Sequence, residues 1–338
     1  MRTSSTTVVI LVSKKRLSLP FLESNMKRIV LLGFLLISTA VWSSEGVFEI
    51  NQACAAVGCF PGDTAGLPVT ITQSGAYRLT SNLNVPTTHG ISVTAEGVQL
   101  DLGGFTISGP VVCSGSPIAC TPSSYGPTSV LVSGVTNGVV VRNGRVQGFG
   151  PGIFSGPNGV IENIVSIGNA ATGIVVGDGA IVRNSSAIYN GTTGIATGLG
   201  SQVIDSVASF NKQYGIAVGR NGDNGGSVIR NTSVILNTGT GIYDAGRSII
   251  EGCLINGNTD RGIQINQGGS QLIDNIITKN GAGVYVDSSG LYEPGGVAST
   301  FSGNTLTGNN GGSANAQLEG NGVKVFLTPN LCGTVICS

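Results

Sequence analysis

Charged side chains that could act on a substrate gather between residues 220 and 261. Only 10% of the residues are charged, so few other segments could bring an acid and a base together. Hydrolysis of a glycosidic bond uses two carboxyl groups about 5 to 9.5 Å apart, one as acid and one as base or nucleophile. The candidate catalytic residues are Arg220, Asp223 and Asp244, and the candidate substrate-binding residues are Tyr243, Arg247, Asp260 and Arg261.

Asp244 has two interpretations. The equivalent positions of neighbouring repeats hold Val218 and Ile265, so strict strand alternation would bury its carboxyl among apolar groups. Burial would raise the pKa of that carboxyl, as a general acid requires. Alternatively, the register shifts after a longer repeat and Asp244 becomes a solvated corner residue. We favour the solvated position.

Metal and cofactor chemistry has little support. His89 is the only histidine and no Cys-x2-Cys pair is present, so a zinc site is not expected. The segment Gly222-Asp223-Asn224-Gly225-Gly226 shares residue types with calcium loops but lacks their alternating acidic ligands. We therefore expect no cofactor and leave calcium as the one open alternative.

The seven cysteines form three close pairs and one single residue. Exported chains meet an oxidising compartment, where such pairs form disulfides. We expect Cys253 to stay reduced and buried. The expected disulfides are Cys54 with Cys59, Cys113 with Cys120, and Cys332 with Cys337.

A repeat must position all of these residues. A glycine followed by an apolar residue recurs from Gly152 to Gly283 with spacings of 21, 21, 21, 26, 21 and 21. Short β-branched segments separated by Gly and Asn at this period predict a stack of coils built from strands. The expected inward column is Ile174, Ile195, Ile216, Ile242 and Ile263. The Asn column expected to hydrogen-bond from coil to coil is Asn169, Asn190, Asn211, Asn237, Asn258 and Asn280.

This repeat resembles that of the right-handed parallel β-helix proteins, a pectate-lyase-like superfamily that includes exported bacterial proteins of uncharacterised function. The resemblance implies an all-β fold: one right-handed parallel β-helix solenoid with coils of about 21 residues and capped ends. Residues 1–25 are expected to precede the true start. The further expected parts are a signal peptide at 26–43, an N-terminal cap at 44–80, the β-helix at 81–310 and a C-terminal cap at 311–338.

The expected compartment is secreted or periplasmic. Lys27-Arg28, an apolar run to Ile37 and small residues to Ser43 follow the order of a signal peptide, which leaves no integral membrane segment after cleavage. From residue 44 onward, 11 basic and 16 acidic residues remain, a net charge of −5. This charge disfavours nucleic acid as a partner.

Two functions fit these observations. The first is a noncatalytic exported module that binds a polysaccharide or cell-surface glycan or has a structural role, favoured by the low charge and the absence of Trp beyond Trp42. The second, which the resemblance implies, is a polysaccharide lyase or glycoside hydrolase with its site near residues 220–261. The sequence leaves open whether the protein is an enzyme.

Overall fold

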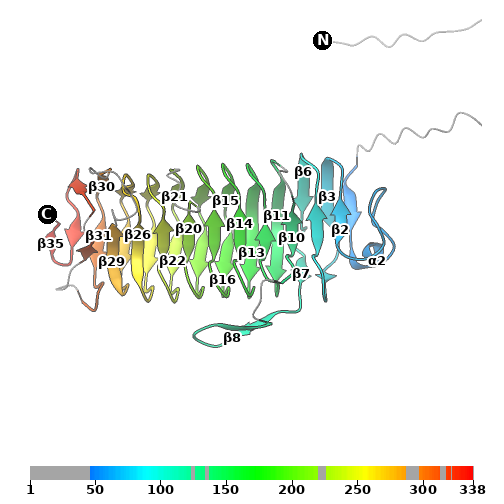
Figure 1. The fold of residues 1–338 in the computed structure, drawn as a ribbon, viewed down its shortest axis with the longest axis horizontal. Coiled ribbons are helices and arrows are strands. Elements are labelled where there is room, and N and C mark those ends of the chain that lie inside the picture. Colours follow the sequence, from blue (N-terminus) through cyan, green and yellow to red (C-terminus); the bar gives the residue numbers. More distant parts are fainter. Residues whose placement is uncertain are drawn as a thin grey trace, which may run out of the picture. The chain divides into compact units, whose positions relative to one another are not determined.

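The computed structural model describes residues 46–122, 126–133, 137–219, 226–286, 297–312, 317–320 and 322–337. The described part from residue 46 onward is one elongated solenoid in which successive coils stack side by side (Figure 1). The predicted all-β, right-handed parallel β-helix is confirmed, and its only described helix is the short α2 (Gln52–Ala55).

Each regular coil contributes strands to three faces. Face 1 is an 11-stranded parallel sheet. Its strands are β2 (Val69–Ile71), β5 (Ile91–Val93), β10 (Val130–Val132), β12 (Ile153–Phe154), β14 (Ile174–Val176), β17 (Ile195–Thr197), β20 (Ile216–Val218), β23 (Ile242–Asp244), β26 (Arg261–Ile265), β29 (Ala282–Val286) and β32 (Leu318–Glu319).

Faces 2 and 3 belong to one 22-stranded sheet that bends between them. Face 2 holds β1 (Phe48–Ile50), β3 (Gly75–Leu79), β6 (Val98–Asp101), β11 (Val140–Gln147), β13 (Val160–Ile167), β15 (Ile181–Arg183), β18 (Gln202–Ile204), β21 (Val228–Arg230), β24 (Ile249–Glu251), β27 (Gln271–Ile273), β30 (Ser299–Ser302) and β33 (Lys324–Phe326). Face 3 holds β4 (Leu83–Asn84), β7 (Thr106–Ser108), the second halves of β11 and β13, β16 (Ser186–Ile188), β19 (Val207–Ser209), β22 (Ser233–Ile235), β25 (Leu254–Asn256), β28 (Ile276–Thr278), β31 (Thr305–Thr307) and β34 (Leu331–Cys332).

Strand alternation creates the core. On face 1, Ile195 pairs with Ile216 and Ile216 with Ile242, and all three side chains are fully buried. On each strand, the residue that follows the isoleucine points outward, because successive side chains of a strand lie on opposite faces of the sheet. The predicted inward Ile column is therefore confirmed.

The sheet bends sharply between faces 2 and 3, and Asn or Asp residues occupy this corner because the bend requires a left-handed backbone. Asn184, Asp205 and Asn231 have φ of 49°, 49° and 50°, a left-handed conformation that Asn and Asp tolerate better than most residues. Glycine takes over this role at Gly252, with φ of 62°. This corner turns the chain with one or two residues and keeps the coils in register.

The predicted Asn column is an internal ladder. Asn190 donates from Nδ2 to Asn211 Oδ1 at 2.9 Å, and Asn211 donates in turn to Asn237 Oδ1 at 2.9 Å. These side chains are buried, so each hydrogen bond satisfies a group that water does not reach. The ladder continues to Asn309, where Gln317 accepts the last of these bonds at 3.1 Å.

The structure contains all three predicted disulfides. Cys54–Cys59 joins α2 to the following turn near the N-terminal end, and Cys332–Cys337 closes the antiparallel pair formed by β34 and β35 (Val335–Ile336). Cys113–Cys120 joins β8 (Val112–Ser114) to β9 (Ala119–Thr121), a hairpin that leaves the coils. Cys253 is free and buried, as expected.

Candidate functional site

The predicted site residues lie in separate places. Arg220 and Asp223 lie outside the described residues. In the sequence they fall between β20 on face 1 and β21 on face 2. Asp244 lies inside the solenoid, Arg247 follows the end of β23, and Asp260 and Arg261 lie at the start of β26. Because the face 1 strands are parallel, Arg247 and the Asp260–Arg261 pair lie at opposite edges of that face.

The favoured solvated position of Asp244 is wrong. Asp244 pairs in register with Val218 and Ile265 and is 0% exposed. The five extra residues of the longer coil fall between β20 and β21 in the sequence, and the register of β23 is unchanged.

Hydroxyl and amide donors surround the buried carboxyl. Ser248 Oγ donates to Asp244 Oδ1 at 2.6 Å, Ser270 Oγ donates to Oδ2 at 2.5 Å, and the Gly246 amide donates to Oδ1 at 3.0 Å. Burial raises the pKa of Asp244, and these three hydrogen bonds oppose that rise. The carboxyl faces partners within the coils and has no contact with solvent, which suits a structural bridge better than proton transfer to a ligand.

A signal for this environment was present in the sequence. Ser227, Ser248, Ser270 and Ser299 occupy one column along the coils, and each backbone amide donates to the hydroxyl of the next residue in the column. Asp244 lies four residues before Ser248 of this column, so its side chain has hydroxyl partners inside the core.

Tyr243 lies on the outer side of face 1. Its ring centroid is 5.2 Å from that of Tyr214 on the preceding coil, with the ring planes 37° apart. Burial raises the pKa of Tyr243, and the nearby Tyr214 and Asp244 add to the rise. Tyr214 was not singled out from the sequence, although it directly precedes the repeat glycine Gly215 and so lies beside the outward column.

A chain of polar side chains extends from Tyr243 across β26. Asn266 Nδ2 donates to the Tyr243 hydroxyl, and Gln264 Nε2 donates to Asn266 Oδ1 at 2.9 Å. Arg261 Nη1 donates to Gln264 Oε1 at 3.3 Å and lies 3.3 Å from Asp260 Oδ2. We call Tyr214, Tyr243, Asp260, Arg261, Gln264 and Asn266 the face 1 patch. Three of the predicted binding residues meet here, together with three partners, Tyr214, Gln264 and Asn266, that the fold brings to them.

Ion pairs form a column on face 2. Arg142 pairs with Asp101 at 3.3 Å, Arg183 with Glu162 at 2.9 Å, and Arg230 with Glu251 at 2.7 Å. Every pair joins neighbouring coils and is partly exposed, so each is worth at most about 1 kcal/mol. These charges pair with one another at the surface and form no acid and base set.

Within the described ranges, no three His, Cys, Asp or Glu side chains are grouped so that they could hold a metal ion. The segment considered for calcium, residues 222–226, lies outside the described residues except for Gly226.

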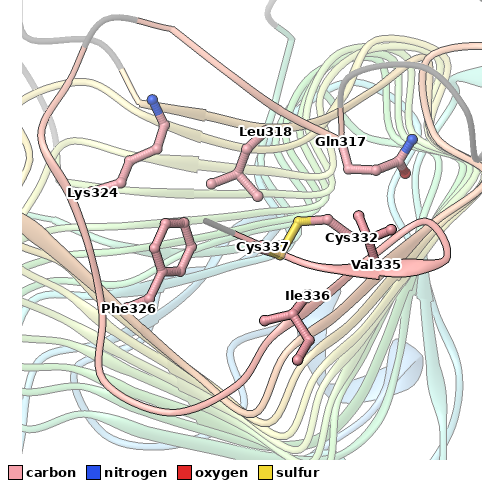
Figure 2. A pocket seen from close by; sticks show the side chains of 8 residues that line it. All are labelled: Gln317, Leu318, Lys324, Phe326, Cys332, Val335, Ile336 and Cys337. Carbon is pink, nitrogen blue, oxygen red and sulfur yellow. A yellow bond between two sulfur atoms is a disulfide. The ribbon is translucent and has the colours of Figure 1, made fainter.

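A cavity of about 510 Å³ opens at the C-terminal end of the solenoid. Figure 2 shows Leu318, Phe326 and the Cys332–Cys337 disulfide around it. Lys324 extends to the rim, where its Nζ donates to the Gly320 carbonyl at 2.8 Å, and burial lowers its pKa. The cavity is the incompletely covered end of the core, because Gln317, which accepts the last bond of the Asn ladder, is part of its lining.

Comparison with known proteins bears on the fold. The family model described as right handed beta helix region matches residues 177–329. Among curated protein sequences, none matches the chain. No described helix is both long and apolar enough to cross a membrane.

Solved structures with similar folds have low sequence identity to this chain. The Dettilon tailspike protein is 15% identical with a TM-score of 0.56, and the match covers 83% of this chain and 60% of the tailspike chain. The periplasmic alginate epimerase AlgG is 13% identical with a TM-score of 0.58, covering 84% of this chain and 83% of AlgG. The catalytic domain of a GH87 α-1,3-glucanase is 12% identical with a TM-score of 0.51, covering 85% of this chain and 62% of that domain. The similarity at these identities is one of fold.

Proposed function

Because the chain folds as a right-handed parallel β-helix, we propose that it is an exported, noncatalytic module that binds a polysaccharide or cell-surface glycan through the face 1 patch. The observation that supports this most directly is the Tyr214 and Tyr243 ring pair, edged by side chains that already hydrogen-bond to one another. Aromatic faces next to fixed polar groups are suited to stacking against a sugar ring and orienting its hydroxyls.

The arrangement of carboxyls favours binding over catalysis. Asp244 has its hydrogen-bond donors inside the core, and Asp260 is engaged by Arg261 and by Thr240 Oγ1, which donates to it at 2.9 Å. An acid and a base on either side of a glycosidic bond need two accessible carboxyls facing one cleft. Arg220 and Asp223 stay candidates for a lyase or hydrolase, and the test below includes them.

Related folds support glycan as the ligand class. One similar structure is an alginate epimerase, and another is an α-1,3-glucanase domain solved with tetrasaccharides. The three disulfides support an oxidising compartment, in agreement with the proposed export.

Binding to a panel of soluble polysaccharides, with calcium present and absent, tests the proposal. The panel contains alginate, polygalacturonate and α-1,3-gluco-oligosaccharides, and reducing ends and unsaturated products are measured in parallel. Tyr243→Ala should weaken binding about tenfold, because it removes one stacking face. Arg183→Ala, which removes a charge on face 2, should leave binding unchanged.

Product release would contradict the noncatalytic assignment. If products appear, the triple variant Arg220→Ala, Asp223→Ala and Asp244→Asn, in which the last change keeps the shape of the buried side chain, shows whether they depend on the 220–261 region. Binding that Tyr243→Ala does not weaken would place the surface elsewhere.

A further inference from the structure

Bulky apolar side chains form a ledge across three consecutive coils, at the corner that follows face 3. Tyr189, Phe210 and Leu236 directly follow β16, β19 and β22 and are 37%, 39% and 49% exposed. The rings of Tyr189 and Phe210 stack, with centroids 5.2 Å apart and planes 19° apart. We call these three residues the corner ledge.

The backbone at the corner ledge is unfavourable for large side chains. Tyr189, Phe210 and Leu236 have φ of 57°, 54° and 55°, in the left-handed region that glycine adopts most readily. The same corner is occupied by Gly168 before the ledge and Gly257 after it, with φ of 63° and 67°. Burial of these side chains offsets little of the cost of the left-handed backbone, since all three are exposed. Strained residues of this kind are characteristic of functional surfaces.

The hairpin of β8 and β9 lies over the coils next to the corner ledge. Ile118 is 4% exposed and lines a pocket of about 220 Å³ together with Ala170, Ala171 and Thr192. Figure 1 shows the hairpin leaving the solenoid near β7 and extending beside it toward the C-terminal end. The Ile118 contact and the Cys113–Cys120 disulfide hold the hairpin in a defined position.

A groove of about 380 Å³ separates the hairpin tip from the corner ledge. Ser116 and Pro117 of the hairpin line it together with Phe210 and Leu236 of the corner ledge. Thr238 and Thr259 add hydroxyl groups from successive coils. Among the residues that line this groove and the adjoining pocket, the only charged one is Lys212.

We propose that the corner ledge and the hairpin of β8 and β9 form a second binding groove, which takes an uncharged glycan chain along the solenoid axis. Phe210 and Leu236 offer the groove an apolar surface for a sugar ring, Tyr189 supports Phe210 by stacking against it, and the threonine and serine hydroxyls can exchange hydrogen bonds with sugar hydroxyls. The scarcity of charge favours a neutral polymer over an anionic one. The ligand class rests on the proposed function, but this groove is lined by other residues than the face 1 patch and lies at the corner that precedes face 1, where Thr259 of the groove directly precedes Asp260 of the patch.

The test measures binding of dextran, mannan and a soluble β-glucan by the full chain, with alginate as the anionic comparison. The double variant Tyr189→Gly and Phe210→Gly should bind the neutral polymers at least about tenfold more weakly. Its unfolding temperature should not fall, because adjacent coils already carry glycine at this corner and glycine relieves the left-handed strain. Ile276→Ala removes an exposed apolar side chain of face 3 away from the groove and should not change binding.

Two further variants test the geometry. Phe210→Trp keeps a flat ring in the groove and should retain binding, with a change in tryptophan fluorescence on addition of the polymer. Cys113→Ser with Cys120→Ser releases the hairpin and should weaken binding while leaving the unfolding of the coils unchanged.

Four outcomes would overturn the inference. The wild type could bind none of the neutral polymers, or the glycine variant could bind as well as the wild type. Loss of binding in Tyr243→Ala alone would support the face 1 patch and reject this groove. Sedimentation showing a dimer that the glycine variant abolishes would instead identify the corner ledge as a contact between two copies of the chain.

Discussion

At the scale of single residues, Asp244 shows how a solenoid core accommodates a charge-bearing group. Its partner Ser248 belongs to the same coil, and its partner Ser270 belongs to the next. The carboxyl therefore links two coils through hydroxyl donors, where Val218 and Ile265 make only apolar contacts. A buried polar group of this kind is stable only while all of its hydrogen bonds are made.

The raised pKa of Asp244 predicts a pH dependence of stability. The folded state binds this proton more tightly than the unfolded state, so the free energy of unfolding should fall as pH rises from about 4 through the raised pKa. Asp244→Asn, which keeps the shape, lacks this dependence. Urea denaturation between pH 4 and 8 should show the wild type losing stability relative to the variant, by about 1.4 kcal/mol for each unit of raised pKa. A difference that stays constant with pH would contradict this assignment.

At the scale of elements, the strands are only two to eight residues long, and the columns between coils hold them in place. The Asn ladder supplies side-chain hydrogen bonds parallel to those of the sheets. Asn211 donates to the Ala187 carbonyl at 3.0 Å and accepts from the Asn190 amide at 3.1 Å, besides its two bonds within the ladder. One side chain therefore connects three coils.

Removal of one member of the ladder should destabilise the solenoid. Asn211→Ala leaves the Ala187 carbonyl and the Asn190 amide without these partners in a buried site. We expect the free energy of unfolding to fall by about 3 kcal/mol. Lys212→Ala, at the adjacent exposed position, should change it by less than about 0.5 kcal/mol. Equal effects of the two substitutions in urea denaturation would contradict a structural role for the ladder.

Strand alternation predicts opposite outcomes for neighbouring positions of β20. Ile216→Asp places an unpaired charge in the core and should prevent folding, since the cost exceeds about 4 kcal/mol. Ala217→Asp, one residue further along, points outward and should fold with a loss of less than about 1 kcal/mol. Far-UV circular dichroism of the purified variants separates the two, and a folded Ile216→Asp variant would show that the inward column is misassigned.

At the scale of the whole molecule, each coil contacts mainly its two neighbours, and the core runs without a break from the N-terminal end to the cavity of Figure 2. Stability of such a stack comes from interfaces between adjacent coils. Cys253 lies within that core, 2% exposed, and so reports whether the coils around it are open.

Alkylation of Cys253 should follow unfolding of the solenoid. Burial raises the pKa of its thiol to about 11, so at pH 8 only about one thiol in a thousand is a reactive thiolate. Treatment of the native protein with N-ethylmaleimide should leave Cys253 unmodified, and treatment in denaturant should modify it alone, with the six other cysteines in disulfides. Mass spectrometry of both samples checks this, and rapid labelling of the native protein would indicate local opening.

The sequence by itself determined the fold because a coil interacts with the coils one period away. The Ile column, the Asn ladder and the Arg183–Glu162 ion pair all join residues one repeat apart, so a one-dimensional pattern contains them. The three disulfides join cysteines at most seven residues apart and follow from spacing alone.

Only the tertiary structure decided the candidate sites. Whether Asp244 is solvated depends on hydroxyls from two coils and on where the extra residues of the longer coil leave the stack. The groove under the hairpin depends on how far the hairpin extends over the stack, since Ser116 meets Phe210 and Leu236 from coils much later in the chain. The repeat predicts whether a given position of each coil is buried or exposed. The hairpin of β8 and β9 lies outside the repeat, so the repeat spacing does not predict which residues it contacts.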